Sequence, residues 1–306
     1  MNGNPTLEEL LEVQRHLGRL APAFIEKDWY VIRALAAIAA VDAAPFRLIF
    51  QGGTALSRAH LLTERMSEDI DFKIVSEQKY GKGPYKRLRE RVTEMLLAAG
   101  FDFDPTNAAH RKTMYEYKYV VFQLPFPSVT GKAPELRPGI KIEMSAWPMR
   151  RPSIERPVRS FVAEAFGHTP EVTAIACADL SENVAEKFVA LTRRAGAQLA
   201  GVWAKRDPTL VRHIYDMHML SKHVDAATVA VLAAEIMKDD AESRGGQFPA
   251  YGEDPLRETQ KAVTGIIQDS EFAKEYAAFV DRMVYGERVP FEAAVATVVD
   301  VGKRLA

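Results

Sequence analysis

The sequence contains very little cysteine and no long apolar run. Cys177 is the single cysteine among 306 residues, so no disulfide can form within the chain. The most apolar stretch, Val31 to Val41, is alanine-rich and shorter than the about 20 residues that cross a bilayer. The first residues also lack the basic segment and apolar run of a signal peptide. These absences lead us to expect a cytoplasmic protein with no membrane contact.

An excess of charge of one sign is also absent. Forty basic side chains against 41 acidic ones give a formal net charge of −1, so nothing global draws the chain to nucleic acid or to an anionic membrane. We expect any contact with RNA to use a local patch. One basic stretch is a candidate for gripping a phosphate backbone, although arginines among prolines are also typical of a solvated loop. It consists of Arg150, Arg151, Arg156 and Arg159.

The hydrophobic spacing of the first 176 residues predicts a sheet flanked by helices. Two helices, over 6–20 and 22–41, precede a short strand over 46–50 that runs into Gly52-Gly53, and Thr54 then caps a helix to about residue 63. Residues 69–75 alternate polar and apolar side chains as a half-buried strand does, which places Asp69 and Asp71 on one face. The remaining predicted elements are a helix over 83–100 and strands over 115–126, 139–145 and 172–176.

After Ala178 the pattern changes to helical periodicity, interrupted by short turns at residues 196–201, 208, 245–246 and 290. The fold class predicted is therefore α/β, in the α+β sense. We expect a core with a mixed sheet flanked by helices over residues 1–176 and a helical bundle domain over residues 177–306.

The glycine turn and the aspartate pair together point to phosphoryl or nucleotidyl transfer. Two carboxylates at i and i+2 on one strand face supply hard oxygen ligands for Mg²⁺, or for Mn²⁺. Gly52 and Gly53 let the backbone approach a phosphate, and the helix that follows offers free N–H groups. Either half alone is more typical of an ordinary turn or a solvated strand face, but the two in this order favour a nucleotide site.

A second aspartate pair in the chain serves as an internal control. Asp102 and Asp104 are also two residues apart, but no glycine turn precedes them and Pro105 follows at once. This pair predicts the solvated face of a short edge strand.

These residues resemble a known family. The segments Gly52-Gly-Thr-Ala-Leu-Ser57 and Arg65-Met-Ser-Glu-Asp-Ile-Asp-Phe72 look like the first two motifs of the AbiEii/AbiGii toxin family, within the DNA polymerase β-like nucleotidyltransferases. Ile25 to Tyr30 is similar to its N-terminal signature. The resemblance implies the toxin of a type IV-like toxin–antitoxin system. It also implies that Thr54, Ser57, Arg65 and Ser67 join Gly52 and Gly53 in binding the nucleotide.

Two later segments are similar to the third and fourth motifs of this family. Lys187 falls within the apolar stripe of its helix, so its ammonium either meets an anion or reaches water along its stem. Asp216 matches the later aspartate of the fourth motif, where it would orient Lys187 or help deprotonate the attacking hydroxyl. His213 replaces an aspartate of the family pattern, and an Arg212–Asp216 helix pair is an alternative explanation for this segment.

A third carboxylate for the metal is expected on a neighbouring strand. Glu143 alternates correctly within residues 139–145, but Lys141 shares its face. An exposed lysine–glutamate strand face therefore explains both residues equally well.

The resemblance implies a Mg²⁺-dependent enzyme that transfers NMP from an NTP to RNA, with a tRNA 3′ end as the favoured acceptor, and that thereby blocks translation and growth. An antitoxin encoded nearby is the expected partner. Two alternatives remain open. In the first, the same enzyme transfers the nucleotide to a protein hydroxyl. In the second, the chain binds NTP or a partner without catalysis.

Overall fold

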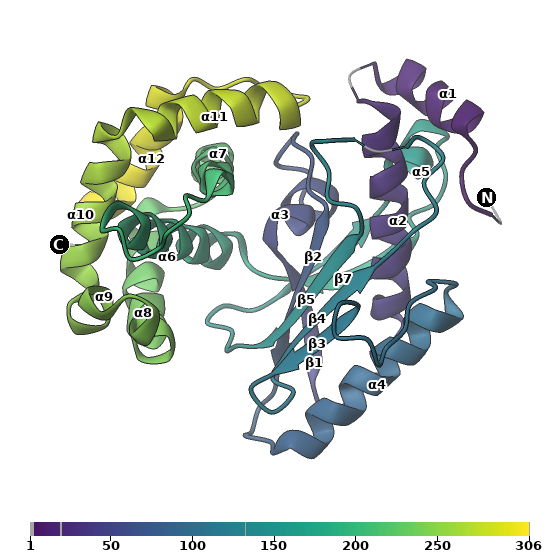
Figure 1. Cartoon of the computed structure of the whole chain (residues 1–306), viewed down its shortest axis with the longest axis horizontal. Coiled ribbons are helices and arrows are strands. Elements are labelled where there is room, and N and C mark those ends of the chain that lie inside the picture. The colour runs from purple at the N-terminus through teal and green to yellow at the C-terminus, as the bar shows by residue number, and fades with distance from the viewer. Residues whose placement is uncertain (1–2, 19, 132, 306) are drawn as a thin grey trace. The chain divides into compact units, whose positions relative to one another are not determined.

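The structure of the chain, a computed structural model, describes residues 3–18, 20–131 and 133–305 (Figure 1). These residues fall into two compact units. Unit 1 comprises the residues up to Leu61 together with Met66–Ala178. Unit 2 comprises Leu62–Arg65 and the residues from Asp179 onward. Four residues of the N-terminal half therefore belong to unit 2.

Unit 1 contains, within its described residues, a mixed sheet of seven strands in the order β3-β4-β5-β2-β1-β7-β6. β2 pairs in parallel with β5, and β1 in parallel with β7, while the other neighbours are antiparallel. The strands are β1 (Arg47–Gln51), β2 (Asp69–Val75), β3 (Arg111–Met114), β4 (Tyr119–Leu124), β5 (Ile140–Ala146), β6 (Ile154–Val158) and β7 (Val172–Cys177).

The main helices of unit 1 cover one face of this sheet. α1 begins at a capping box in which the Thr6 side chain and Glu9 satisfy each other's backbone N–H groups. α2 and α4 pack on one face of the sheet and share its hydrophobic core. The helices are α1 (Leu7–Leu17), α2 (Pro22–Ala39), the short α3 (Gly52–Thr54) that continues into a π-helical turn η1 (Ala55–Ala59), α4 (Lys82–Ala98) and α5 (Phe161–Ala165).

The alternation of side chains gives the sheet one apolar and one polar face. Phe50, Phe72 and Ile142 are fully or almost fully buried in the core beneath α2 and α4. On the opposite face a row of side chains crosses from strand to strand, because opposite residues in paired strands point the same way. The row runs through Gln51, Asp71, Glu143, Val121 and Lys112.

Unit 2 is helical, apart from its short N-terminal segment. That segment pairs through Arg65 with Val284 in an isolated antiparallel bridge, and the N–H groups of Tyr285 and Gly286 donate to the Glu64 carbonyl. The helices are α6 (Leu180–Leu199), η2 (Pro208–Leu210), α7 (Val211–Leu220), η3 (Ser221–His223), α8 (Ala226–Arg244), η4 (Gly245–Gln247), α9 (Pro249–Glu253), α10 (Pro255–Gln268), α11 (Ser270–Met283) and α12 (Phe291–Arg304). No helix in the described part of the chain combines the length and apolar character needed to span a membrane.

The structure confirms the predicted fold class and most of the predicted elements. β2 has the predicted bounds. The bounds of α1, α2, α4, β1, β5 and β7 lie within two residues of the predicted ones, except that α1 ends three residues early. The periodicity of these segments is strong because each buries one face against the core.

Several local predictions were wrong. Residues 115–126 form a turn and β4 rather than one strand, because Tyr115, Glu116 and Tyr117 adopt left-handed backbone conformations and reverse the chain after β3. Residues 101–104 form no strand, although Phe101 and Phe103 are buried as the alternation requires.

Two further corrections concern residues near proline or glycine. Arg156 lies on the edge strand β6 rather than in a loop, since an edge strand tolerates Pro157. The predicted turn at 196–201 begins only after Leu199, because Gly196 continues α6 and packs against Phe248.

Candidate functional site

The glycine turn after β1 is built directly against the aspartate pair. Gly52 has a left-handed backbone with φ of 77°, which favours glycine. A Cβ atom placed on Gly52 would stand 2.3 Å from Oδ2 of Asp71 and 3.1 Å from its Cγ. Only glycine leaves room for that carboxylate, so Gly52 and Asp71 form one structural feature although 19 positions separate them.

The hydroxyl groups near the turn hold its shape. Thr54 is inside the helical segment rather than at its cap, which corrects the prediction. Its Oγ1 donates to the Asp69 carbonyl and lies within hydrogen-bond distance of the Ser67 hydroxyl, at 2.9 Å. Ser57 Oγ donates to the Thr54 carbonyl at 3.3 Å. Thr54 and Ser57 are both buried, whereas Gly53 and Ser67 are half-buried. The Thr54 hydroxyl thus ties the turn to β2, and the Ser57 hydroxyl bonds within the helical segment.

A cationic side chain that the sequence analysis missed covers Asp69. Nη1 of Arg137 lies 3.0 Å from both carboxylate oxygens of Asp69, and the backbone N–H of Arg137 donates to Glu68 at 2.9 Å. Lys27 on α2 pairs with the same Glu68 at 3.3 Å and donates to the Arg137 carbonyl at 2.8 Å. Asp69 is therefore held by a network of alternating charges that reaches back to α2.

The N-terminal signature on α2 explains how this network is anchored, because three consecutive charged residues are buried there. Glu26 accepts hydrogen bonds from the backbone N–H groups of Val129 and Thr130. Asp28 accepts from the Phe161 N–H at 2.7 Å and pairs with Arg58 of η1 at 3.3 Å. Each residue fastens a different segment to α2, and burial raises the pKa of Asp28 to about 6 against the opposing effect of Arg58.

The donor set on the polar face fits a divalent cation. Asp69 and Asp71 offer hard oxygens on one face of β2, and Oε1 of Gln51, in the same cross-strand row as Asp71, is buried without a hydrogen-bond donor among the described residues. No three histidine, cysteine, aspartate or glutamate side chains within the described ranges are grouped as a metal site. The candidate site thus has two carboxylates from β2, Asp69 and Asp71, and a buried amide oxygen from Gln51.

Glu143 lies opposite Asp71, as predicted, but has other partners. Its carboxylate accepts a hydrogen bond from the Tyr119 hydroxyl and pairs with Lys141 at 2.9 Å. Burial would raise the pKa of Glu143, yet these contacts lower it overall. Its role as a third metal ligand stays a prediction.

A second cluster of candidate residues lies in unit 2. Nε and Nη2 of Arg65 hold the two oxygens of Asp216 at 2.6 and 2.7 Å, and Nζ of Lys187 lies 2.8 Å from Oδ2. Asp216 is fully buried and Lys187 is only 7% exposed. Neither cation lies on the helix of Asp216, so the contacts run between segments far apart in sequence. Arg65 and Lys187 thus share one carboxylate, so these three side chains together carry a net positive charge.

The charges of this cluster shift one another's ionisation. Burial raises the pKa of Asp216, but Arg65 and Lys187 more than offset it and hold that pKa well below its usual range. Burial lowers the pKa of Lys187, and the Asp216 carboxylate opposes this change. Buried charges of this kind are stable only when paired and hydrogen-bonded, which is what the geometry provides.

His213, which stands where an aspartate was expected, differs from an aspartate in its charge and its hydrogen bonding. Burial lowers its pKa well below the usual value, and the nearby cations Lys187 and Arg212 act in the same direction. Its Nδ1 atom has no hydrogen-bond partner in the part of the chain that the structure describes. An imidazole with a lowered pKa does not supply the negative charge of the aspartate expected here.

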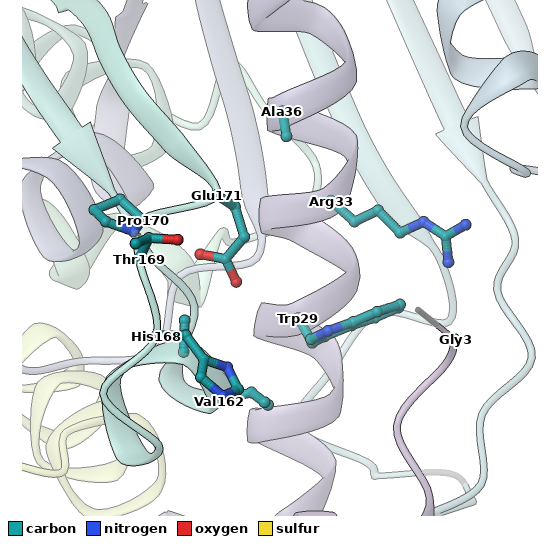
Figure 2. A pocket seen from close by; sticks show the side chains of 10 residues that line it. Gly3, Trp29, Arg33, Ala36, Val162, His168, Thr169, Pro170 and Glu171 are labelled. Atoms are coloured by element: carbon teal, nitrogen blue, oxygen red, sulfur yellow. The ribbon is translucent and has the colours of Figure 1, made fainter. Parts of the chain in front are cut away.

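A cavity of about 600 Å³ lies in unit 1 (Figure 2). Trp29, Arg33 and Ala36 of α2 line one side, and His168 to Glu171 line another. The Arg33 guanidinium is occupied by the Asn4 side chain and the Ala99 carbonyl, and Ser160 donates to the Glu171 carboxylate. None of the residues predicted for the site lines this cavity.

The comparison with known proteins gives one family, described as the nucleotidyl transferase AbiEii toxin of a type IV toxin–antitoxin system. Its model matches residues 33–297, a range that contains the glycine turn, the aspartate pair, Lys187 and Asp216. No curated protein shows significant sequence similarity to the chain.

Among solved structures, the chain is similar to MenT4, a nucleotidyltransferase toxin of Mycobacterium tuberculosis H37Rv. The two share 17% sequence identity with a TM-score of 0.47, over 97% of this chain and 88% of MenT4. The match to the family model extends over most of the chain and confirms the resemblance seen in its motifs. The chain belongs to the AbiEii family of nucleotidyltransferase toxins of type IV toxin–antitoxin systems.

Proposed function

We propose that this toxin transfers NMP from an NTP to the 3′-hydroxyl of an RNA, with the 3′ end of tRNA as the preferred acceptor. The hydroxyl oxygen forms a bond to the α-phosphorus while the bond from that phosphorus to the β-phosphate bridging oxygen breaks. Pyrophosphate leaves and the hydroxyl proton passes to solvent. Blocking the acceptor end of tRNA would stop translation, as expected of a toxin.

The close packing of Gly52 on Asp71 is the observation that carries this proposal. A turn in which a Cβ atom would overlap a carboxylate oxygen brings the backbone of Gly52 and Gly53 to the same place as the anionic side chain. Such a turn lets a triphosphate approach the backbone beside the aspartates, where a metal ion held by them would balance its charge. An ordinary strand-to-helix turn has no need of this contact.

Asp69 and Asp71 would hold the metal ion, Mg²⁺ or Mn²⁺. When bound, the ion supplies positive charge to the triphosphate and to the pyrophosphate that leaves. The ion would compete with Arg137 for Asp69, whose oxygens Arg137 contacts at 3.0 Å. We assign to Arg137, which is 40% exposed, the task of neutralising Asp69 until the nucleotide arrives.

Lys187 would neutralise charge that develops on the phosphates in the transition state. Asp216 orients it, and does not act as the base, because both carboxylate oxygens already accept from cations and its pKa is lowered. Arg65 then acts as a positioning residue: it holds Asp216 by two hydrogen bonds. The contacts around the carboxylate support this choice between the two roles open to Asp216.

The test uses each of the four NTPs, labelled at the α-phosphate, with total bacterial tRNA, followed by separation of RNA from protein. We expect label in RNA and none when the tRNA 3′ end has been oxidised with periodate. The γ-labelled NTP should yield labelled pyrophosphate and leave the RNA unlabelled. Label in the protein fraction would instead favour a protein hydroxyl as acceptor, and absence of pyrophosphate release would favour a non-catalytic binding protein.

Matched variants of the two aspartate pairs make this test specific. Asp69→Ala and Asp71→Ala should each abolish transfer, since one carboxylate cannot hold the metal in the required geometry, while circular dichroism stays unchanged. Asp102→Ala removes an exposed aspartate from the other pair and should retain activity. Full activity of either site variant at low Mg²⁺ would refute the metal assignment.

A further inference from the structure

The hairpin formed by β3 and β4 and the first half of α4 carry an unusual concentration of positive charge. Residues 77–91 contain six basic and two acidic side chains, a net charge of +4 in a chain whose total is −1. Among them Lys82, Lys86 and Arg87 are exposed on α4. Lys112 and Lys118 are exposed on the hairpin, where Glu116 is the one opposing charge among residues 111–118.

The hairpin and α4 are packed together at the β3 edge of the sheet, where α4 lies on the apolar face and the Lys112 side chain belongs to the polar face. The Arg89 guanidinium lies over the Tyr117 ring at 4.5 Å, and its Nη1 donates to Thr113 at 3.3 Å. Arg111 of β3 donates to Thr93 of α4 at 2.8 Å. These contacts fix the exposed cations of the two elements relative to one another.

The tip of the hairpin is strained in a way that presents an aromatic ring. Tyr115, Glu116 and Tyr117 have φ of 51°, 56° and 70°, a left-handed run that side chains other than glycine rarely adopt. Tyr117 is held by Arg89, but the Tyr115 side chain is 71% exposed. Strained non-glycine residues cluster at functional sites, and an exposed ring beside cations suits stacking against a base.

This surface leads across the sheet to the aspartate pair. Lys112 is in the same cross-strand row as Asp71, three strand spacings away, through Glu143 and Val121. At about 4.8 Å per spacing, the backbones of Lys112 and Asp71 are about 14 Å apart on one face of unit 1. A strand of nucleic acid bound at the hairpin can therefore extend to the carboxylates along that face.

We propose that the surface around the edge strand β3, made by Lys82, Lys86 and Arg87 of α4 on one side and by Lys112, Tyr115 and Lys118 of the hairpin, binds the phosphate backbone and one base of the RNA acceptor. The inference rests on the proposed function, since it identifies where the RNA substrate is held. It differs from the arginine stretch at 150–159, of which Arg156 lies at the opposite edge of the sheet on β6. The cations supply affinity, and Tyr115 supplies stacking.

The test is binding of fluorescein-labelled tRNA without NTP, together with KM for tRNA in the labelling assay. The variant Lys82→Ala/Lys86→Ala/Arg87→Ala should bind tRNA at least tenfold more weakly. The slope of log affinity against log salt concentration should fall by about 2–3, because about 0.7–0.9 is lost with each phosphate contact. The control removes the same charge from exposed lysines of unit 2, Lys222, Lys238 and Lys303, and should change neither quantity.

Tyr115 is tested without disturbing the turn. Tyr115→Asn removes the ring but tolerates the left-handed backbone, so it should raise KM for tRNA severalfold while thermal stability is kept. Tyr115→Phe retains the ring and should behave as the wild type.

The outcomes separate this inference from the proposed function. If wild-type protein labels RNA but the triple variant keeps the same affinity, KM and salt slope, the surface is wrong and the function stands. If wild-type protein labels no RNA, the function fails, and the binding assay alone then decides the surface. If only binding to polyglutamate, used as a probe for an acidic protein, is lost in the triple variant, the surface belongs to a protein partner and the inference is overturned.

Discussion

Replacement of Gly52 by alanine is the sharpest test of the candidate site. The change adds one methyl group at a position with φ of 77°, 2.3 Å from Oδ2 of Asp71. Two effects follow, and they differ in kind. The backbone becomes strained, which lowers stability, and the carboxylate must move, which alters the site.

The structure gives a magnitude for each effect. An alanine in a left-handed conformation costs about 1–2 kcal/mol, which lowers the melting temperature by a few degrees. An ordinary contact of a Cβ atom begins near 3.4 Å, so Oδ2 of Asp71 must shift by about 1 Å. Displacement of a reacting group by about 1 Å costs on the order of a hundredfold in rate.

The assay compares Gly52→Ala with Gly18→Ala. Gly18 has nearly the same backbone, with φ of 71°, but nothing lies within 4 Å of an added Cβ atom. Both variants should lose similar stability in urea unfolding. Only Gly52→Ala should lose about a hundredfold in the rate of RNA labelling at saturating NTP.

The reasoning is refuted if Gly52→Ala loses no more activity than Gly18→Ala while both remain folded. Such a result would mean that Asp71 need not stay where the glycine turn places it. A loss of stability far beyond that of Gly18→Ala would show that the overlap is relieved by unfolding the turn and not by movement of the carboxylate.

The remaining predictions concern the charged partners of the site. Lys187→Ala should cost about 2–4 kcal/mol of barrier, roughly a hundredfold or more in rate, with Lys187→Arg only partly active; an active Lys187→Met variant would remove this residue from the site. Asp216→Asn should destabilise the fold by about 3–5 kcal/mol, because it leaves two buried cations without their anion. Because the pKa of Asp216 is lowered in the folded state, its ionised carboxylate stabilises the fold above the unfolded-state pKa of about 3.9. This contribution is lost as the pH falls from about 3.9 towards the lower folded-state pKa. The free energies of unfolding of wild type and Asp216→Asn, measured in urea, should therefore converge at low pH. Arg137→Ala frees Asp69 from a partly exposed ion pair, worth about 0.2–1 kcal/mol, and should lower the half-saturating Mg²⁺ concentration up to about fivefold; a higher Mg²⁺ requirement would contradict the competition we assign to it.

Some elements could be predicted from the sequence because their signals are local. The alternation over 69–75 fixed both the bounds of β2 and the shared face of Asp69 and Asp71. The apolar stripe of α6 likewise placed Lys187 towards the interior, where it is 7% exposed. Both patterns repeat over several residues, so each position supports the next.

Other elements failed because their conformation opposes local preference. The turn at Tyr115 uses left-handed tyrosines and a glutamate where glycine or asparagine is expected, so nothing in the sequence indicated the separate strand β3 or the turn that joins it to β4. β6 contains Pro157 and exposed charged residues and is strand only because β7 offers it an edge. In both cases tertiary pairing decided the structure.

The sequence by itself determined which residues are candidates to face a phosphate or a metal, since that chemistry requires glycines and paired carboxylates at fixed short spacing. The tertiary structure alone decided their partners. Arg65 meets Asp216 across 151 positions and Arg137 meets Asp69 across 68, separations at which no periodicity survives. Those contacts exist because buried charges must be matched by whichever opposite charge the fold brings near.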